Sequence, residues 1–366
     1  MILMNDFKSD PKELKQSMLS AMNRVIESGR FILGGELENL ELQWSQICKV
    51  NHSVGVGNGM DAIEIALRVL NIGPGDEVIT TPMTAFATTL AIMRAGAVPV
   101  LADIEEGTAL LSMTSVERSL NARTKAIILV HLYGQVRSMD KWRNLSDKYG
   151  LFLIEDCAQA HLTSWRGNFA GTFGDMGTYS FYPTKNLGAL GDAGMLVTNN
   201  KGFAEKAECI RNYGQSIRYH HPEIGMNSRL DEIQAAILIE RLKWLSRFNE
   251  RKKRIAEFYK QGIQNNLIMK MIDPEELSAH NYHQFVIMCA ERNRFQSHLL
   301  NHQIETLIHY PIPIHHQKPC INIKRDPKGL PVSERHANQC VSLPCHPHLK
   351  DSEINHVIDS INSFKG

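Results

Sequence analysis

Short apolar runs alternate with stretches of helical periodicity through the first half of the chain. The apolar runs, which predict buried strands, are SVGV (53–56), EVITT (77–81), VPVLADI (98–104), AIILVHL (126–132) and LFLIED (151–156). Between them, apolar side chains recur at the spacing of one helix face in residues 61–70, 85–96 and 138–150. Apolar strands that alternate with helices are typical of a parallel sheet covered on both faces. The pattern therefore predicts an α/β fold.

The pattern changes in the second half of the chain. YSFYP (179–183) and MLVTN (195–199) predict two more strands, which flank a glycine-rich loop. Residues 231–263 have a continuous helical pattern, which predicts a long, bent helix. The remainder mixes helices with short strands such as HQFVIMC (283–289) and includes a proline- and histidine-rich stretch at 309–319.

The length of the chain bears on its domain organisation. A chain of 366 residues is long enough for a large core and for two domains. We expect the long helix to link them, so we predict a large domain at 1–245 and a smaller α+β domain at 246–366.

Composition and charge exclude several classes of partner. The net charge of +1, with 43% hydrophobic and 22% charged residues, is typical of a globular protein and provides no general attraction to nucleic acid or to a membrane. The basic stretch from Arg247 to Arg254 lacks interleaved aromatic residues, so we interpret it as a solvated helix face. No apolar run approaches the roughly 20 residues of a membrane-spanning helix.

Cysteine usage and the amino-terminal residues indicate a cellular compartment. The seven cysteines follow no repeating spacing, which argues against a disulfide framework and favours a reducing environment. The stretch MILMNDFKSD is too short and too soon polar for a signal peptide. We therefore expect a cytoplasmic protein.

A glycine-containing turn follows the first predicted strand and opens a predicted helix. It reads Gly57-Asn58-Gly59-Met60-Asp61. Glycine lets the backbone approach a ligand, and the first amides of a helix are unpaired and attract anions. The turn therefore indicates a phosphate site, although an ordinary turn with Asp61 favouring the helix dipole fits the same residues.

An acidic residue ends another predicted strand. Asp156 lies at the carboxyl end of LFLIED, where ligands bind in open α/β sheets. An acid there can hold a positively charged ring nitrogen, and Gln159, three residues on, can face the same crevice. The alternative is a strand-end carboxylate paired with a surface base.

Lys185 lies in the stretch SFYPTKNLGALGD (180–192), between a predicted strand and several glycines. A lysine that attacks a carbonyl must lose its proton, and burial or a nearby cation makes that possible. A phosphate turn, a strand-end acid and a loop lysine, in this order, are what pyridoxal 5′-phosphate requires: an anchor for its phosphate, an anion at its ring nitrogen and an amine at its aldehyde.

Two groups of potential metal ligands occur near the carboxyl end. They are Cys340, Cys345, His346 and His348, and His315, His316 and Cys320. None has a recognised pairing such as CxxC, so we predict no metal site and favour loop or substrate contacts.

Several ordered stretches resemble the DegT family of nucleotide-sugar aminotransferases. The matching stretches, which cover nearly the whole chain, are residues 28–41, 54–79, 154–161, 171–199, 211–215, 225–238, 309–315 and 342–347. The resemblance implies the fold of the aspartate aminotransferase (type I) enzymes, with a mostly parallel seven-stranded sheet flanked by helices in the large domain. It also implies pyridoxal 5′-phosphate as cofactor.

Roles for individual residues follow from the resemblance. Lys185 would bond covalently to the cofactor and move protons, and Asp156 would hold the pyridine nitrogen. The remaining cofactor contacts would be Gln159 at the ring hydroxyl, Ser180 and the amides of Gly59 and Met60 at the phosphate, and Asn227 at the phosphate of a neighbouring subunit. The last role implies a homodimer with shared active sites.

The chain departs from the family pattern at three places. Met60 stands where the family usually has Thr or Ser, so only the backbone contact to phosphate remains. The aromatic residue that covers the ring usually follows the equivalent of Thr84, where this chain has Ala85 and then Phe86. Either Phe86 stacks on the ring through a local shift, or it packs as an ordinary helix residue and another group covers the ring. His161 belongs to Ala160-His161-Leu162, where relatives often have AHG.

The resemblance also implies a reaction. The amino group of L-glutamate would pass to a keto group of a nucleotide-linked deoxysugar, nearest to dTDP-3-keto-6-deoxyhexoses, in amino-sugar biosynthesis for cell-surface polysaccharides such as the lipopolysaccharide O-antigen or for secondary metabolites. The substrate contacts that we predict are His161, Tyr182, Arg229, His309 and Tyr310. The alternatives are a C4-ketosugar aminotransferase, a regulatory protein that binds the cofactor without transamination, and a sugar dehydratase, whose relatives have His in place of Lys185.

Overall fold

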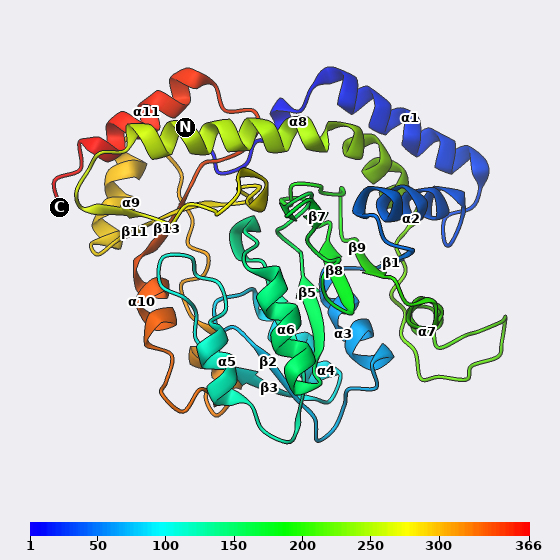
Figure 1. The fold of residues 1–366 in the computed structure, drawn as a ribbon. Helices are drawn as coiled ribbons and strands as arrows, with labels where there is room; N and C mark the ends of the chain where they lie inside the picture. Colours follow the sequence, from blue (N-terminus) through cyan, green and yellow to red (C-terminus); the bar gives the residue numbers. More distant parts are fainter.

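The computed structural model describes residues 1–366 and contains a large, mostly parallel sheet in the order β1-β9-β8-β5-β4-β2-β3-β12 (Figure 1). Its strands are β1 (His52–Val56), β2 (Glu77–Thr80), β3 (Val98–Leu101), β4 (Thr124–Val130), β5 (Phe152–Asp156), β8 (Met176–Ser180), β9 (Gly194–Thr198) and β12 (Lys324–Arg325). Only β9 runs against the others. Most of their residues are buried, as in a sheet with helices on both faces.

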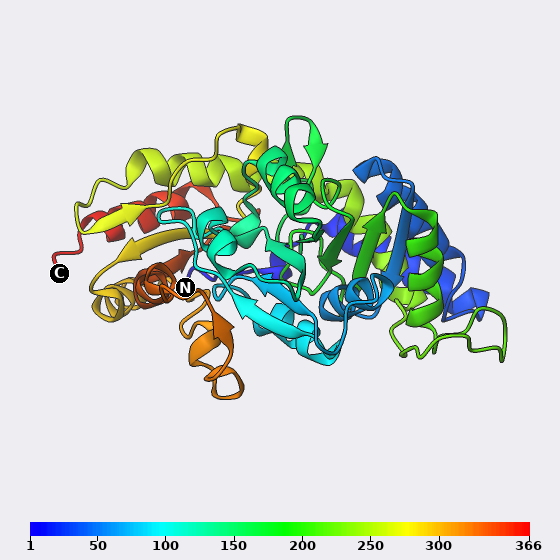
Figure 2. The same ribbon diagram turned by 60° about the horizontal axis from the view of Figure 1, so that its bottom comes forward.

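Helices cover both faces of this sheet, as the alternating pattern predicts (Figures 1 and 2). They are α1 (Lys12–Ser28), α2 (Gly35–Cys48), α3 (Gly59–Val69), α4 (Phe86–Arg94), α5 (Met113–Ser119), α6 (Met139–Tyr149) and α7 (Lys201–Arg211). Two separate hydrophobic clusters, of 35 and 33 buried residues, fill the spaces between the sheet and its helices. The predicted α/β fold is confirmed.

The predicted elements differ from the observed ones in two ways. The large sheet has eight strands and not seven, because the short β12 from the carboxyl-terminal part of the chain pairs in parallel with β3. In addition, β8 begins at Met176, ahead of the predicted 179–183 run, and ends at Ser180. The apolar residue Phe181, which we predicted in the strand, is buried in the loop that follows.

The predicted long helix is α8 (Glu232–Gly262), a single element of 31 residues that spans the top of the molecule in Figure 1. Its first half packs on α1 and α2. Its second half belongs to a separate core of 22 buried residues, which are Ile2 and residues between 255 and 364. The predicted boundary between residues 245 and 246 therefore falls inside one continuous helix and stays a prediction.

The carboxyl-terminal part is built around a small antiparallel sheet, β10-β11-β13. Its elements are β10 (Ile268–Lys270), β11 (Phe285–Cys289), α9 (Arg292–Asn301), α10 (Pro331–Gln339), β13 (Cys340–Leu343) and α11 (Asp351–Asn362). The remaining short elements of the molecule are η1 (Phe7–Ser9), η2 (Leu132–Gly134), β6 (Ser164–Trp165), β7 (Asn168–Phe169), η3 (Leu277–Ala279), η4 (Ile314–His316) and η5 (Lys318–Cys320).

The strand order brings the ends of β1, β5 and β8 to one region of the molecule. Gly194, the first residue of β9, pairs with Val56 at the end of β1 and with Ser180 at the end of β8. Strand β5, which ends at Asp156, lies on the other side of β8. The three predicted chemical features follow these strands, so the fold places them together.

Two general predictions concern cysteines and membranes. All seven cysteines are free thiols, and six of them are buried, so no disulfide framework exists. None of the helices combines the length and the apolar composition needed to cross a membrane.

Candidate active site

The amino-terminal end of α3 forms one wall of the site. Asn58 caps the helix, and its side-chain oxygen accepts a hydrogen bond from the Asp61 amide at 2.8 Å. The amides of Gly59 and Met60 precede the first intrahelical donors and have no partner within the helix. The Met60 side chain packs on the core of the large sheet. This end of the helix therefore offers backbone donors to an anion, and the phosphate site itself stays a prediction.

Gly59 lies directly against Ser180. A Cβ added at Gly59 would be 2.6 Å from the Ser180 Cβ and 3.0 Å from its Cα. A Cβ added at Gly194 would be 2.4 Å from the carbonyl carbon and oxygen of Asn58, so two glycines allow the close approach. The hydroxyl of Ser180 and the first amides of α3 consequently lie side by side as a group of donors.

We expect Gly59→Ala to weaken phosphate binding and to lower the stability of the fold. The added methyl group cannot fit against the backbone of Ser180, and overpacking of this kind costs about 1–3 kcal/mol. Titration with inorganic phosphate and the free energy of unfolding would measure both effects. Gly35→Ala, where nothing lies within 4 Å of the added Cβ, is the matched control. Unchanged phosphate affinity in Gly59→Ala would contradict the assignment.

Asp156 is buried at the end of β5, with 5% of its surface exposed. Its Oδ2 accepts a hydrogen bond from the Thr88 hydroxyl at 2.9 Å, and its Oδ1 accepts one from the Ala158 amide at 3.1 Å. Thr88 in turn lies 2.8 Å from the Thr84 hydroxyl. Helix α4 thus holds the carboxylate in one orientation. Sequence reasoning missed Thr88, because a threonine in a helix gives no signal of a partner 68 residues away.

Lys185 lies in the loop after β8, half-buried, with its amide bonded to the Tyr182 carbonyl at 2.8 Å. Burial lowers the pKa of its ammonium group to about 8, although the nearby Asp156 carboxylate acts in the opposite direction. An amine with this pKa is largely free of its proton in mildly alkaline solution, as a nucleophilic lysine must be. The influence of the Asp156 carboxylate on the ammonium group also indicates that the acid lies near the amine.

Gln159 connects the large-domain strand end to the carboxyl-terminal part of the chain. Its side-chain oxygen accepts a hydrogen bond from the Tyr133 amide at 2.6 Å, and its side-chain nitrogen donates to the Tyr310 hydroxyl at 3.3 Å. Burial and the Asp156 carboxylate raise the pKa of Tyr310 to about 12, so its phenol keeps its proton. Gln159 and Tyr310 therefore lie together near Asp156, and their predicted roles at the cofactor and the substrate stay predictions.

His309 also lies near Lys185. Its Nδ1 is 2.8 Å from the Ser342 hydroxyl, and burial together with the Lys185 ammonium lowers the pKa of its imidazole to about 4. The Tyr133 hydroxyl donates to the His309 carbonyl and lies 2.9 Å from His336 Nε2. Tyr133 thus joins the two parts of the site, and its neighbours in the sequence gave no indication of that role.

Asn186, next to Lys185, ties the lysine loop to α8. Its side-chain nitrogen donates to the Asn249 side-chain oxygen at 2.7 Å, and its side-chain oxygen lies 3.1 Å from His283 Nδ1. Asn249 donates onward to the His161 carbonyl at 3.0 Å. The loop that carries the lysine is therefore tied through Asn186 to side chains from two separate segments.

Two predicted residues have surroundings that favour packing roles. His161 is fully buried among the rings of Trp44, Tyr179 and Phe181, with centroids 5.6–6.1 Å apart. Burial, and to a smaller extent Lys185, lower the pKa of its imidazole to about 3, so the ring is neutral. Phe86 packs on a small apolar cluster around Ile314 and Leu330. Their predicted roles at the substrate and at the cofactor ring stay predictions.

Three other predicted residues lie at or near the surface. Tyr182 is exposed beside Lys185, and Arg229 lies with its guanidinium 5.3 Å from the ring centre of Tyr213. Asn227 is exposed, and its backbone pairs with Asn212 at the base of the loop between α7 and α8. This loop projects from the molecule in Figure 1, so its residues are available to a second chain.

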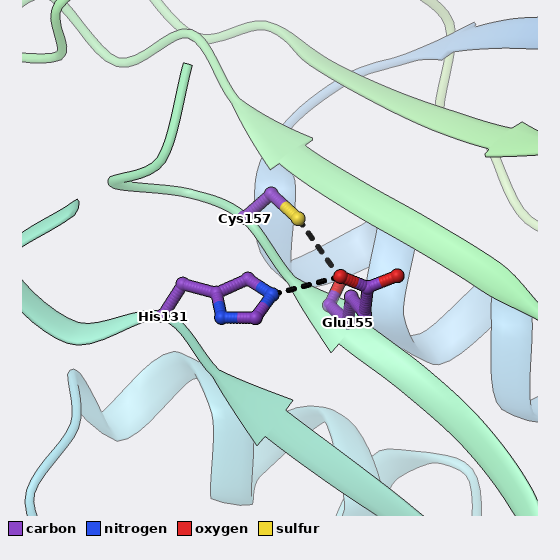
Figure 3. A group of neighbouring side chains, drawn as sticks. All are labelled: His131, Glu155 and Cys157. Atoms are coloured by element: carbon purple, nitrogen blue, oxygen red, sulfur yellow. Dashed lines mark hydrogen bonds and ion pairs between the residues drawn. The ribbon is translucent and has the colours of Figure 1, made fainter. Parts of the chain in front are cut away.

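His131, Glu155 and Cys157 form a buried cluster at the ends of the paired strands β4 and β5, where Glu155 directly precedes Asp156 (Figure 3). One carboxylate oxygen of Glu155 is bonded to His131 Nε2 and to the Gly171 amide, both at 2.8 Å. The other accepts from the amides of Phe173 and Gly174 at 2.7 and 2.8 Å. Hydrogen bonds to the loop before β8 thus occupy both oxygens, which explains the cluster without a metal.

Comparison with known proteins places this geometry among aminotransferases. The model described as the DegT/DnrJ/EryC1/StrS aminotransferase family matches residues 12–362. The chain is 41% identical over 353 residues to the dTDP-3-amino-3,6-dideoxy-alpha-D-galactopyranose transaminase of Aneurinibacillus thermoaerophilus, with 96% of this chain and 95% of the relative covered.

Two further comparisons bear on fold and function. The chain is 39% identical over 363 residues to the pleiotropic regulatory protein of Geobacillus stearothermophilus, covering 99% of this chain and 98% of the relative. The X-ray crystal structure of S. venezuelae DesV superposes with a TM-score of 0.95 at 40% identity, covering 99% of this chain and 97% of that one.

Proposed function

The chain belongs to the DegT/DnrJ/EryC1/StrS aminotransferase family and is a sugar aminotransferase, and from this premise we propose that it moves the amino group of L-glutamate to the C3 keto group of a dTDP-linked 6-deoxyhexose. We further propose that it uses pyridoxal 5′-phosphate, acts as a homodimer with shared active sites and works in the cytoplasm. Its product would serve amino-sugar biosynthesis, either for a polysaccharide such as the lipopolysaccharide O-antigen or for a secondary metabolite.

The observation that carries this proposal is the convergence of three unrelated segments on one space. The donor group of Gly59, Met60 and Ser180 would hold the phosphate, because the missing Cβ atoms at Gly59 and Gly194 leave the backbone open there. Buried Asp156 would hold the ring nitrogen, and Gln159 the ring hydroxyl. The Lys185 amine, with its lowered pKa, would meet the aldehyde. The donor set fits the cofactor at each of its functional groups.

The chemistry divides between the cofactor and the chain. When bound, pyridoxal 5′-phosphate supplies an aldehyde that takes up amines and a ring that accepts electrons from the reacting carbon. Asp156 would keep a positive charge on the ring nitrogen, and Thr88 and the Ala158 amide hold this carboxylate in place. The Nζ atom of Lys185 takes a proton from the α-carbon of glutamate in the first half-reaction and gives one to the ketone carbon of the sugar in the second.

The identity of the sugar rests on relatives. The transaminase of Aneurinibacillus thermoaerophilus is named for a dTDP-3-amino sugar. It is 41% identical to this chain over 96% of this chain's length. His309 and Tyr310 border the Lys185 space, so we propose them as substrate contacts together with Tyr182 and Arg229. Only a few such contacts decide between related ketosugars, and a C4 ketosugar is the nearest competing substrate.

A panel of nucleotide-linked ketosugars with L-glutamate tests this proposal. The protein is incubated with dTDP-3-keto- and dTDP-4-keto-6-deoxyhexoses and with UDP- and GDP-linked analogues, and the aminated products are detected by mass and located by NMR. We expect turnover of the dTDP-3-keto sugar with nitrogen at C3. Amination at C4 alone would overturn the C3 assignment.

One relative favours a second function. The pleiotropic regulatory protein of Geobacillus stearothermophilus matches nearly the whole chain. A regulatory protein of this kind would bind the cofactor without transferring amino groups. Addition of glutamate separates the two functions, because the absorbance of the bound cofactor is lost only if an amino group is transferred to it. An absorbance that stays constant with every amino donor would favour the regulatory function.

The lowered pKa of Lys185 makes a prediction about pH. The neutral amine attacks the cofactor, so the rate at which cofactor-free protein acquires the cofactor's absorbance should rise about tenfold per pH unit below pH 8 and level off above it. In Asp156→Asn the midpoint should move to lower pH, because the carboxylate raises the pKa of Lys185. A rate that kept rising past pH 9.5 would indicate an ordinary lysine.

A further inference from the structure

A second lysine is buried close to the lysine loop. Lys252, in the second half of α8, has 7% of its surface exposed, and its ammonium group donates to the His283 carbonyl at 3.2 Å. It takes part in none of the ion pairs of the molecule, although surface lysines nearby do. Burial lowers its pKa. A buried cation without a counter-charge is costly, which is a reason to look for an anion that it binds.

Lys252 and Lys185 line the same cavity. The hollow measures about 480 Å³ with its mouth, and it lies between the lysine loop, α8, the amino-terminal segment and the loop at 346–348. Thr184 and Asn249 provide further polar groups on its wall. An anion held by Lys252 would therefore be next to the loop that carries the reactive amine.

The other charges in this cavity are largely balanced. Asp10 lies 2.9 Å from both Arg241 and His348, which pair with its two oxygens. His346 is neutral at ordinary pH, since burial lowers its pKa to about 4. Asp6 lies in the amino-terminal segment, where it accepts a hydrogen bond from the Lys8 amide at 3.0 Å. Asp6 and Lys185 also have no ion pair, but Lys185 is assigned to the cofactor and Asp6 lies partly exposed, so Lys252 is the buried cation of this wall that calls for an anion.

His283 connects Lys252 with the lysine loop. Its carbonyl accepts the hydrogen bond of the Lys252 ammonium group at 3.2 Å, and its Nδ1 lies 3.1 Å from the side-chain oxygen of Asn186, the residue next to Lys185. An anion on Lys252 would therefore adjoin the lysine loop.

We propose that Lys252 binds the side-chain carboxylate of the amino donor and so selects a dicarboxylic amino acid over a neutral one. The inference rests on the proposed aminotransferase function. In glutamate, two methylene groups separate this carboxylate from the α-carbon, which suits an anion site that is near the reactive amine but not in contact with it.

The test compares amino donors in the first half-reaction of the holoenzyme. Loss of the cofactor's absorbance is followed with L-glutamate and with L-alanine for the wild type, Lys252→Met and Lys252→Arg. Lys253→Met is the control, because the Lys253 side chain pairs with Glu250 at 2.9 Å. We expect Lys252→Met to lose at least about tenfold in preference for glutamate, since a charge-assisted hydrogen bond is worth that much. Lys252→Arg should recover part of it, and Lys253→Met should match the wild type.

Binding without reaction gives a second readout. Glutarate, a dicarboxylate without an amino group, should raise the melting temperature of the wild type and of Lys253→Met but not that of Lys252→Met. The second half-reaction with the ketosugar should be the same in all four proteins.

Three outcomes would overturn the inference. They are an equal loss with glutamate and alanine in Lys252→Met, an unchanged preference for glutamate, and a loss confined to the ketosugar half-reaction, which would assign the cation to the nucleotide. None of these outcomes contradicts the proposed function. A wild-type protein that accepts no amino donor would instead contradict the proposed function itself.

Discussion

Replacing Lys185 by alanine is expected to lower turnover by at least about a thousandfold. The substitution removes the amine that meets the cofactor and the base that moves the proton at the donor α-carbon, and proton transfer by a positioned group is worth about 10²–10⁴ in rate. Product formation from glutamate and the ketosugar, measured by mass, gives the magnitude. The lysine loop should keep its fold, because Asn186 anchors it to Asn249 and His283.

Two controls make the result specific to Lys185. Lys201→Ala removes a surface lysine from α7, where the side chain is 78% exposed, and should retain wild-type turnover. Non-covalent binding of the cofactor to Lys185→Ala, seen as a rise in melting temperature, would show that the donor group at Gly59 and Ser180 is intact. A Lys185→Ala protein that turned over many equivalents of substrate would refute the assignment.

The second large effect is expected for Asp156→Asn. The asparagine has the same shape and can keep partners at Thr88 and Ala158, but it lacks the charge that holds a proton on the ring nitrogen. Removal of one preorganised electrostatic group typically costs about 10²–10³ in rate, so we expect turnover to fall about a hundredfold while the protein still binds the cofactor. Rates of both half-reactions and the absorbance of the bound cofactor measure the two effects.

Asp147→Asn is the matched control for this substitution. Asp147 lies on α6 with its side chain 60% exposed and pairs with Arg143, so the loss of its charge should leave turnover unchanged. If Asp156→Asn kept full activity, the acid would be a structural strand-end carboxylate, which is the alternative that the sequence leaves open.

The two substitutions also separate the proposed roles of acid and amine. Lys185→Ala should block proton movement in both half-reactions, whereas Asp156→Asn should slow them without changing which atom receives the proton. A common loss of cofactor binding in both variants would instead indicate that they disturb a shared structure. The melting temperature with and without cofactor distinguishes these cases.

Local sequence determines much of this protein. Periodicity within a segment depends on neighbouring residues, so the strands at 77–80 and 152–156 and the long helix at 232–262 could be predicted from their own residues. The phosphate turn, the strand-end acid and the loop lysine could be found in the same way. Each of these residue types carries chemistry at a recognisable place: a helix start, a strand end and a glycine-rich loop.

The sequence by itself predicted an element less accurately where that element depends on partners far along the chain. The two-residue β12 has no periodicity to detect and exists because it pairs with β3. The start of β8 at Met176 follows from pairing with β5 and not from an apolar run. In both cases the ladder of backbone hydrogen bonds, and not the residue pattern, decides where the strand lies.

Only the tertiary structure decided which side chains meet. Gly59 contacts Ser180 because β9 lies between β1 and β8, and Thr88 reaches Asp156 because α4 packs beside the end of β5. His161 lies among aromatic rings and not in open space, and Lys252 is left without an anion. Such facts depend on crossovers and packing between segments that are distant in sequence. The sequence therefore determined which residues we propose for the chemistry, and the fold decided their partners, their burial and the lowered pKa of the Lys185 amine.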